Sequence, residues 1–151
     1  MQTPVPGLGS YDCVGLFGPT CGVPIPDWRH KLQGVWNTPW NWNLALTWRY
    51  TTAVDIDFSS SNPQLTGNFA PSDAKMGSQS YFDIAAQWNI DKTFTIRGGV
   101  NNVFDRDPPV VSSTAGAFPA ISGPAYGNGN TYPQVYDTLG RQFFLSVTAK
   151  F

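Results

Sequence analysis

The chain has 151 residues and a net charge of −1, so it offers no basic surface that would attract nucleic-acid phosphates. Only 13% of its residues are charged, against about 25% in ordinary soluble domains, while 15% are aromatic. Glu, a common residue on exposed helix faces, is absent, and there are 15 Gly and 13 Pro. This composition argues against a helical protein and favours strands joined by turns and long loops.

No apolar run reaches the roughly 18 residues that a transmembrane helix needs. Residues 1–6 show no basic region followed by an apolar core, so the sequence predicts no signal peptide. If the protein is exported, we expect the chain to be a piece of a longer one.

Period-two alternation dominates the sequence and predicts β-strands with two different faces. The five predicted strands cover residues 28–37, 40–58, 81–90, 93–104 and 142–151. All six Trp fall on the apolar phase of this alternation. Charged side chains fall on the polar phase, among them Arg29, Lys31, Arg49, Asp83, Arg97 and Lys150.

The connections between these strands alternate in length. Residues 37–39 and 91–93 form short turns, whereas residues 59–80 and 105–140 form long loops. Short turns on one side and long loops on the other are typical of bacterial outer-membrane barrels, whose tilted strands have about ten residues. We expect one antiparallel meander, with Trp36 opposite Trp40 and Gln87 opposite Arg97.

Two architectures fit these faces. In a soluble β-sandwich, such as a secreted carbohydrate-binding module, the Trp faces would pack against a second sheet. In a barrel wall, they would face lipid and the polar faces would line a wet lumen. The barrel is favoured by aromatic side chains gathered near the short turns, as in an interfacial girdle. These residues are Trp36, Trp40, Trp42, Trp88, Phe94 and Phe151.

Two segments resemble the C-terminal region of TonB-dependent outer-membrane receptors. The first is Ile96-Arg97-Gly98-Gly99-Val100-Asn101-Asn102-Val103-Phe104-Asp105, followed by Asp107-Pro108-Pro109. The second is Tyr132-Pro133-Gln134-Val135-Tyr136-Asp137-Thr138-Leu139-Gly140-Arg141. The terminal Phe151, which follows an alternating strand, resembles the signal that the barrel-assembly machinery reads. The resemblance covers about residues 10–151.

The resemblance implies an all-β fold, in which an antiparallel meander of about five strands is a partial segment of a transmembrane outer-membrane barrel. Residues 1–27 would form an extracellular loop segment, and residues 28–151 the C-terminal barrel strands and loops. The protein would be no enzyme, need no cofactor, bind no nucleic acid and reside in the outer membrane of a Gram-negative bacterium. The family takes up scarce, bulky ligands such as siderophores, cobalamin or oligosaccharides.

The sequence also departs from a complete receptor of this family. Such a receptor has an N-terminal plug, a TonB-coupling box and a barrel of about 22 strands. The chain shows neither plug nor box. Its expected partners are therefore outer-membrane lipid, the remaining barrel and plug, the barrel-assembly machinery and, only through missing N-terminal parts, TonB.

Further site assignments follow from the resemblance. It implies a disulfide between Cys13 and Cys21, with no strand inside the ring, although two free thiols remain an alternative. The motif residues are interpreted as structural, with the asparagines and Asp105 ending a strand. They are Asn101, Asn102, Phe104, Asp105, Pro108, Tyr132, Pro133, Tyr136, Asp137, Gly140, Arg141 and Phe151.

Candidate contact residues come in two groups. The expected lumen-facing residues are Arg29, Arg49, Asp83 and Arg97, for which plain solvation and cross-strand pairing is the alternative. The residues that could contact ligand from the last loop are Phe118, Tyr126, Tyr132 and Tyr136, for which ordinary loop packing is the alternative.

Three other side chains have more ordinary interpretations. Asp55 and Asp57 share a strand face and could bind Ca²⁺, but we expect a solvated extension of the strand. His30 lies on the apolar phase near Trp28 and is interpreted as an interfacial residue rather than a ligand. The sequence contains no phosphate loop, catalytic triad or metal-binding motif.

Overall fold

The computed structural model describes residues 10–111 and 129–150. The fold is all-β and mostly antiparallel, with, among the described residues, only two single-turn 3₁₀ helices, η1 (Asp57–Ser59) and η2 (Pro71–Asp73). No helix in the described part of the chain has the length and apolar character needed to cross a membrane.

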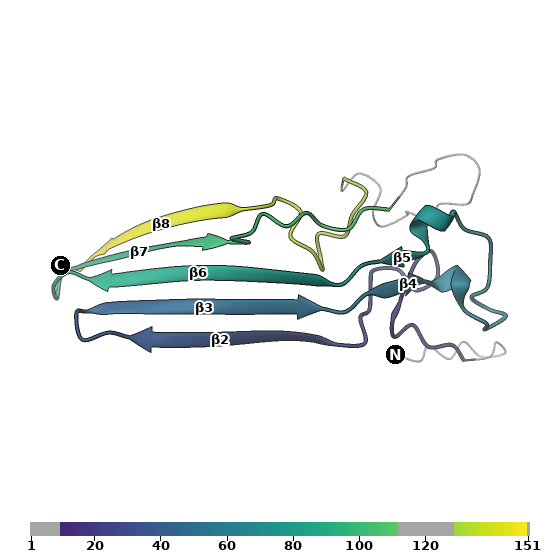
Figure 1. Cartoon of the computed structure of the whole chain (residues 1–151), viewed down its shortest axis with the longest axis horizontal. Coiled ribbons are helices and arrows are strands. Elements are labelled where there is room, and N and C mark those ends of the chain that lie inside the picture. The colour runs from purple at the N-terminus through teal and green to yellow at the C-terminus, as the bar shows by residue number, and fades with distance from the viewer. Residues whose placement is uncertain (1–9, 112–128, 151) are drawn as a thin grey trace. The chain divides into compact units, whose positions relative to one another are not determined.

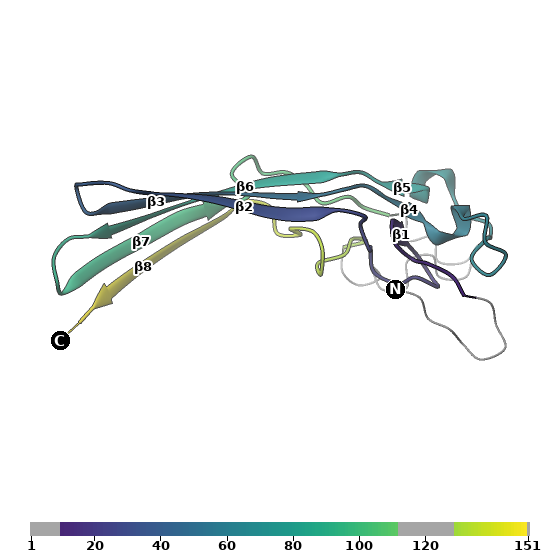
Figure 2. The same ribbon diagram turned by 90° about the horizontal axis from the view of Figure 1, so that it is seen from below.

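The larger sheet has five strands in the order β2-β3-β6-β7-β8, which is their order along the chain (Figure 1). This confirms the predicted meander. Figure 2 shows that β7 and β8 turn away from the plane of β2, β3 and β6, so the sheet is curved. The strand bounds are Arg29–Asn37 for β2, Trp42–Thr51 for β3, Gln79–Asn89 for β6, Phe94–Asn101 for β7 and Gln142–Ala149 for β8.

The strand register confirms one predicted pairing and corrects the other. Gln87 lies opposite Arg97 between β6 and β7, as expected. Trp40, however, belongs to the turn between β2 and β3, where the amide of Thr38 donates to the carbonyl of Trp42 over 2.8 Å. Continuing from that hydrogen bond, Trp36 lies opposite Leu44 rather than Trp40. The shift is an even number of residues, so the two faces of the sheet stay as predicted.

The predicted strand over residues 40–58 is wrong as a single element. It divides into β3, which ends at Thr51, and β4 (Val54–Ile56), which belongs to a second sheet. Thr52 ends the first ladder, because its amide and hydroxyl both donate to the carbonyl of Trp28. The alternation of apolar and polar side chains continues across residues 52 and 53 without a change of phase, so the sequence alone predicted a single strand.

The second sheet has three short strands in the order β1-β4-β5. β1 (Leu16–Phe17) pairs with β4 in parallel, and β5 (Lys75–Met76) pairs with β4 antiparallel. Neither β1 nor β5 was predicted, because two-residue strands have no detectable period. Their pairing with β4 buries a core in which Tyr132 and Phe17 meet edge to face, at a ring-centre distance of 6.1 Å.

Two compact units make up the chain. Unit 1 comprises Met1–Arg29, Thr51–Gln79 and Pro108–Thr138, and it contains the three-stranded sheet. Unit 2 comprises His30–Tyr50, Ser80–Asp107 and Leu139–Phe151, and it contains nearly all of the five-stranded sheet. The core of unit 1 is formed by Phe17, Val54, Ile56, Met76, Val111, Tyr132 and Tyr136.

A disulfide joins Cys13 to Cys21 in unit 1, with their Cα atoms 5.5 Å apart. The ring encloses β1, so the expectation that no strand lies inside it is wrong. Asp57 holds the same loop from outside, because one carboxylate oxygen accepts the amides of Thr20 and Cys21 at 2.8 and 3.0 Å.

Reduction of this disulfide should loosen the β1–β4 pairing and leave the β2–β8 sheet intact. Closing so short a ring removes chain entropy worth about 2.5 kcal/mol from the unfolded state. Hydrogen exchange of Leu16 and Phe17 should accelerate after reduction, while exchange in β6 and β7 stays unchanged. Equal acceleration in both sheets would contradict this expectation.

Candidate functional site

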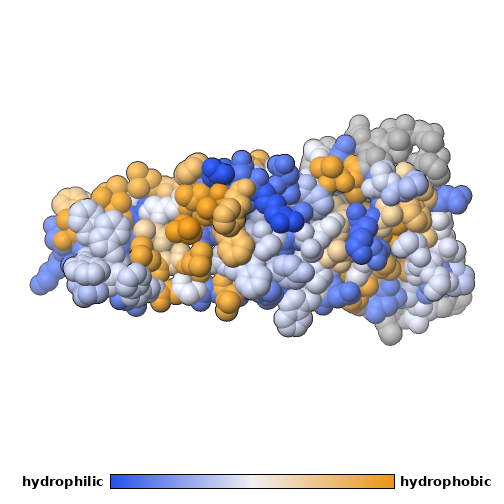
Figure 3. Space-filling model, in the orientation of Figure 1, coloured by the Kyte–Doolittle hydropathy of each residue, from blue (hydrophilic) through white to orange (hydrophobic). Residues whose placement is uncertain are grey.

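One face of the five-stranded sheet in unit 2 is covered by apolar and aromatic side chains. Trp42 stacks on Trp88 with ring centres 5.2 Å apart, and β7 then brings Ile96 opposite Trp88. A second row runs through Ile84, Val100 and, on β8, Phe143. These rows form a continuous apolar band, and Figure 3 shows orange apolar side chains gathered over these strands.

The band is exposed to an unusual degree for such large side chains. In the described structure, the exposed fraction is 61% for Trp36, 51% for Leu46 and 76% for Leu145. Contiguous apolar patches of this kind mark surfaces that contact another protein or a membrane, or that bind a ligand. We call it the apolar band. Its most exposed members are Leu32, Trp36, Trp42, Leu46, Ile84, Trp88, Phe94, Phe143, Leu145 and Val147.

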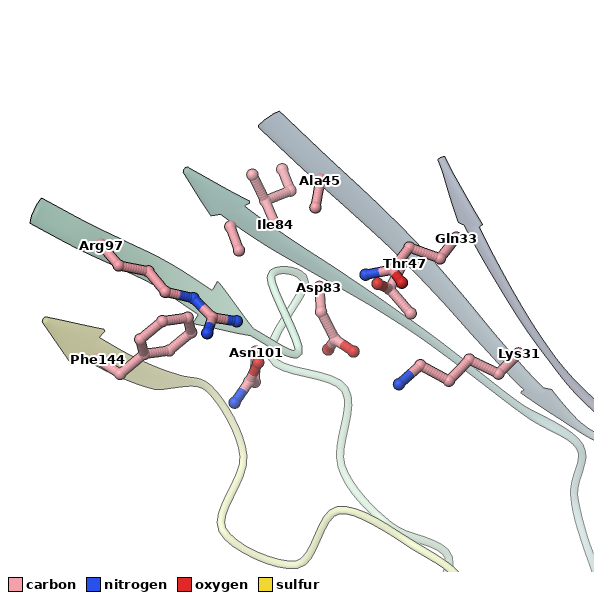
Figure 4. Close-up of a pocket in the computed structure, with 10 residues that line it drawn as sticks. Lys31, Gln33, Ala45, Thr47, Asp83, Ile84, Arg97, Asn101 and Phe144 are labelled. Atoms are coloured by element: carbon pink, nitrogen blue, oxygen red, sulfur yellow. The ribbon is translucent and has the colours of Figure 1, made fainter. Parts of the chain in front are cut away.

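The opposite face is polar and hollowed into a recess with a volume of about 310 Å³ (Figure 4). Asp83 projects into its middle, while Lys31 and Arg97 extend toward it from either side. The recess is lined by Lys31, Gln33, Ala45, Thr47, Asp83, Ile84, Ala85, Arg97, Asn101 and Phe144. Strand alternation therefore gives the sheet one polar and one apolar face.

Arg49 and Asp83 form a bidentate ion pair across β3 and β6. Nε donates to one carboxylate oxygen over 2.8 Å, and a terminal guanidinium nitrogen donates to the other over 2.9 Å. The second oxygen also accepts the amide of Asn102 at 2.9 Å. The guanidinium lies over the ring of Tyr81 as well, 5.2 Å from its centre. Asp83 is therefore well satisfied, and two of the expected lumen-facing residues pair with each other.

The other two expected lumen-facing residues make fewer contacts. The Arg97 guanidinium lies over the Phe144 ring, 5.8 Å from its centre, and no carboxylate of the described residues forms an ion pair with it. Arg29 is exposed at the start of β2. Lys31 is also exposed, so two cationic side chains, Lys31 and Arg97, line the recess together with Asp83.

Replacing Arg49 with Gln should destabilise unit 2, because Asp83 would lose its charged partner while remaining mostly buried. The two side chains are 30% and 17% exposed, so we expect a loss of about 1–3 kcal/mol. A double-mutant cycle with Asp83→Asn, read by chemical unfolding in detergent, should give a coupling of about 1 kcal/mol or more. Additive effects would contradict the pairing.

The motif residues of unit 2 tie two chain segments together. Asn102, at a φ of 51°, exchanges two 2.9 Å hydrogen bonds with the backbone of Arg106. Asp105 accepts the amide of Arg141 at 2.7 Å, next to Gly140, whose φ is +67°. The turn after β7 is thereby joined to the entry of β8. A structural role for these residues agrees with this geometry.

Of the two interpretations of Tyr132 and Tyr136, the structure agrees with ordinary packing rather than with contact to a ligand. They are 0% and 2% exposed and belong to the core of unit 1, because their rings fill the space beside β1 and β4. Phe118, Tyr126 and Phe151 lie outside the described residues. Of the remaining motif residues, Pro133 and Phe104 are exposed, whereas Pro108 and Asp137 are half-buried.

Asp55 of β4 and Asp57 of η1 differ in their exposure to solvent and in their partners. Asp55 is exposed and forms an ion pair with Lys75 over 3.5 Å. Asp57 is 0% exposed, so a solvated carboxylate at this position is contradicted. It lies at the turn that ends β4, where the disulfide loop covers it. Burial, together with the charges of Asp57 and Asp73, raises the pKa of Tyr132 to about 12.

His30 lies edge-on to Trp48, with ring centres 4.6 Å apart, and beside Tyr50 at 5.4 Å. This environment fits an aromatic cluster rather than a metal ligand. Among the described residues, no group of three or more His, Cys, Asp or Glu side chains is arranged to hold a metal ion.

These observations define a curved sheet with one apolar and one polar face, whose motif turns are joined by hydrogen bonds. A scan against protein-family models gives no match, and a search of curated proteins gives none either.

Proposed function

We propose that the chain supplies the last strands of the barrel wall of a TonB-dependent outer-membrane receptor. The observation that carries the proposal is the pairing of an exposed apolar band with a charged recess on opposite faces of one curved meander. A barrel wall requires this division, because its outer face meets lipid while its inner face meets a wet lumen.

The motif geometry supports the same proposal. The resemblance to the receptor family rests largely on residues 96–109 and 132–141. The side chains of Asn102 and Asp105 hydrogen-bond to the backbone of Arg106 and Arg141, which explains why Asn and Asp occupy these motif positions. In the parent receptor, the function would be uptake of a bulky ligand, and this part would provide wall and loops.

The rival, a secreted carbohydrate-binding sandwich, needs the Trp faces covered by a second sheet. Within the described residues, the three-stranded sheet buries its own core in unit 1, and Trp36 stays 61% exposed. A recess lined by Lys31, Asp83 and Arg97 is also not an aromatic sugar platform. Both observations favour lipid as the partner of the apolar band.

Tryptophan quenching tests this proposal directly. The chain is refolded into vesicles whose lipid chains carry bromine, and emission is compared with that in unmodified vesicles. We expect strong quenching by the brominated lipid and weak quenching by aqueous iodide, because most Trp side chains lie on the apolar phase. A chain that stays monomeric in detergent-free water, with no quenching by lipid, would contradict the proposal and favour the sandwich.

The proposal also predicts that residues 1–151 do not transport ligand alone. Bilayer strands need every backbone amide and carbonyl paired, and the described sheet leaves β2 and β8 as open edges. Expressed with an export signal, the chain should self-associate or be degraded, and uptake assays should stay at background. A monomeric product competent in transport would overturn the proposal.

A further inference from the structure

Aromatic side chains on the apolar face of unit 2 form two rows across β2, β3 and β6. On each of these strands, one aromatic residue lies near a short turn and another lies six residues away, toward the long loops. We call these sets the turn row and the loop row. The turn row consists of Trp36, Trp42 and Trp88 and continues to Phe94 on β7, and the loop row consists of His30, Trp48 and Phe82.

Ring contacts join the rows from strand to strand. In the turn row, the rings of Trp42 and Trp88 are stacked with their centres 5.2 Å apart. In the loop row, Trp48 is stacked on Phe82 with ring centres 6.0 Å apart, and His30 meets Trp48 edge to face at 4.6 Å. Two stacked pairs therefore lie on the same two neighbouring strands, one pair toward each end.

The positions between the two rows on this face have neither a ring nor a charge. They are Leu32, Gly34, Leu44, Leu46, Ile84 and Ala86. At the loop row, the indole N–H of Trp48 donates to the hydroxyl of Ser80 over 2.7 Å. Ser80 lies at the long-loop end of β6, so the polar edge of the indole points away from the aliphatic middle. Rings with an apolar body and a polar tip prefer the boundary between hydrocarbon and water.

The turn row crosses the strands obliquely. Trp42 lies two residues nearer the short turn than Leu44, which is the partner of Trp36. Between β3 and β6 the row does not shift, because Trp42 and Trp88 face each other. Phe94 then lies two residues nearer the short turn than the β7 partner of Trp88. The two shifts amount to about 13 Å over three strand spacings of about 14 Å in all, which corresponds to an angle of about 40°. Strands of membrane barrels are tilted by about this angle, so a row of this slope would run parallel to the membrane plane.

We propose that the two rows mark the two boundaries of the hydrocarbon layer around unit 2, and that this layer is thin. The inference rests on the proposed function, because it takes lipid as the partner of the apolar band. Six residues span about 20 Å along a strand, and a tilt of about 40° reduces this to a height of about 15 Å. The apolar surface of outer-membrane barrels is usually about 25 Å tall. The lipid that fits unit 2 therefore has short acyl chains.

The first test varies the thickness of the bilayer. The full chain, with its disulfide intact, is refolded into phosphatidylcholine vesicles whose acyl chains have about 12, 14 or 18 carbons. We expect the urea midpoint of unfolding to be highest with the shortest of these chains and to fall as the mismatch grows. A midpoint that is equal in all three lipids, or that rises with chain length, would overturn the proposal of a thin layer.

The second test measures how deep single indoles lie. Two variants keep only Trp48 or only Trp88, with Phe in place of every other Trp. A third variant has Phe in place of all six Trp and carries Leu46→Trp, which puts the indole in the aliphatic middle as a matched control. A nitroxide on the lipid headgroup should quench Trp48 and Trp88 at least about twofold more than a nitroxide near the chain end. The indole at position 46 should show the reverse order.

The outcomes separate a failure of this inference from a failure of the proposed function. If the chain-end nitroxide quenches Trp48 or Trp88 as strongly as the indole at position 46, lipid covers the sheet but the rows are not its boundaries. If neither nitroxide quenches any of the three indoles, the apolar band does not face lipid, and both proposals are wrong. If the Phe substitutions prevent folding, the chain-length series on the unaltered chain still decides whether the layer is thin.

Discussion

Leu46→Arg should prevent stable insertion of the sheet into a membrane while leaving the strand register unchanged. Leu46 lies near the middle of β3 on the apolar band, with an exposed fraction of 51%. A guanidinium there would have to enter the hydrocarbon region, which costs about 2–4 kcal/mol at the bilayer midplane. The measurement is the unfolding free energy of the chain in lipid vesicles, together with the fraction that is protected from protease.

Gln33→Arg is the matched control, because it places the same side chain on the polar face of the neighbouring strand. Gln33 lines the recess, where an extra guanidinium stays in water. Its effect on insertion should be below about 0.5 kcal/mol. If both variants insert equally well, the apolar band does not meet lipid, and the barrel proposal loses its main support.

Much of unit 2 could be predicted because its sheet follows one rule throughout. Side chains alternate with a period of two, and each strand has eight or more residues, so the faces, the order and the Gln87–Arg97 pairing were all predictable. The Trp36–Trp40 pairing failed for a local reason. The sequence predicted a three-residue turn, but Asn41 adopts a φ of 62° and lengthens it.

The strands of unit 1 could mostly not be predicted from side-chain alternation. Its strands have two or three residues, and their pairing joins segments that are distant along the chain, such as Leu16–Phe17 and Val54–Ile56. Alternation continued through Thr52 and concealed the change of sheet. Asp57 was expected to be solvated because a carboxylate at the end of a strand usually is, whereas in the structure it accepts the amides of Thr20 and Cys21 from the disulfide loop.

For the candidate site residues, the sequence predicted which face of the sheet they lie on but not which residues they contact. Arg49 and Asp83 were placed on one face by alternation, but their bidentate pairing depends on the β3–β6 register, which a loop between the strands does not reveal. For Tyr132 the sequence left ligand contact and ordinary packing open, because aromatic residues in loops often contact ligands. No periodicity marks a loop residue as part of a core, so its burial became apparent only in three dimensions.

Gly99→Ala should be the most disruptive small substitution in unit 2. A Cβ atom at position 99 would lie 2.5 Å from the backbone carbonyl oxygen of Ile84 and 2.6 Å from the ring of Phe144. The carbonyl belongs to the β6–β7 ladder and cannot retreat without breaking pairing, whereas the ring would have to leave its place beneath Arg97. Overpacking of this kind costs about 1–3 kcal/mol.

Gly98→Ala is the control that separates this clash from a general effect of replacing glycine in a strand. Its Cβ would meet only Leu145 and a carbonyl at 3.4 Å, which is near ordinary contact. Both substitutions reduce the entropy of the unfolded chain equally, so the difference between them reports the native-state clash alone. We expect Gly98→Ala to be neutral or slightly stabilising in chemical unfolding, and Gly99→Ala to lower the midpoint clearly. Equal unfolding midpoints for the two variants would contradict the close packing of β6, β7 and β8 around position 99. The close contact of the Phe144 ring with Gly99 would then be wrong.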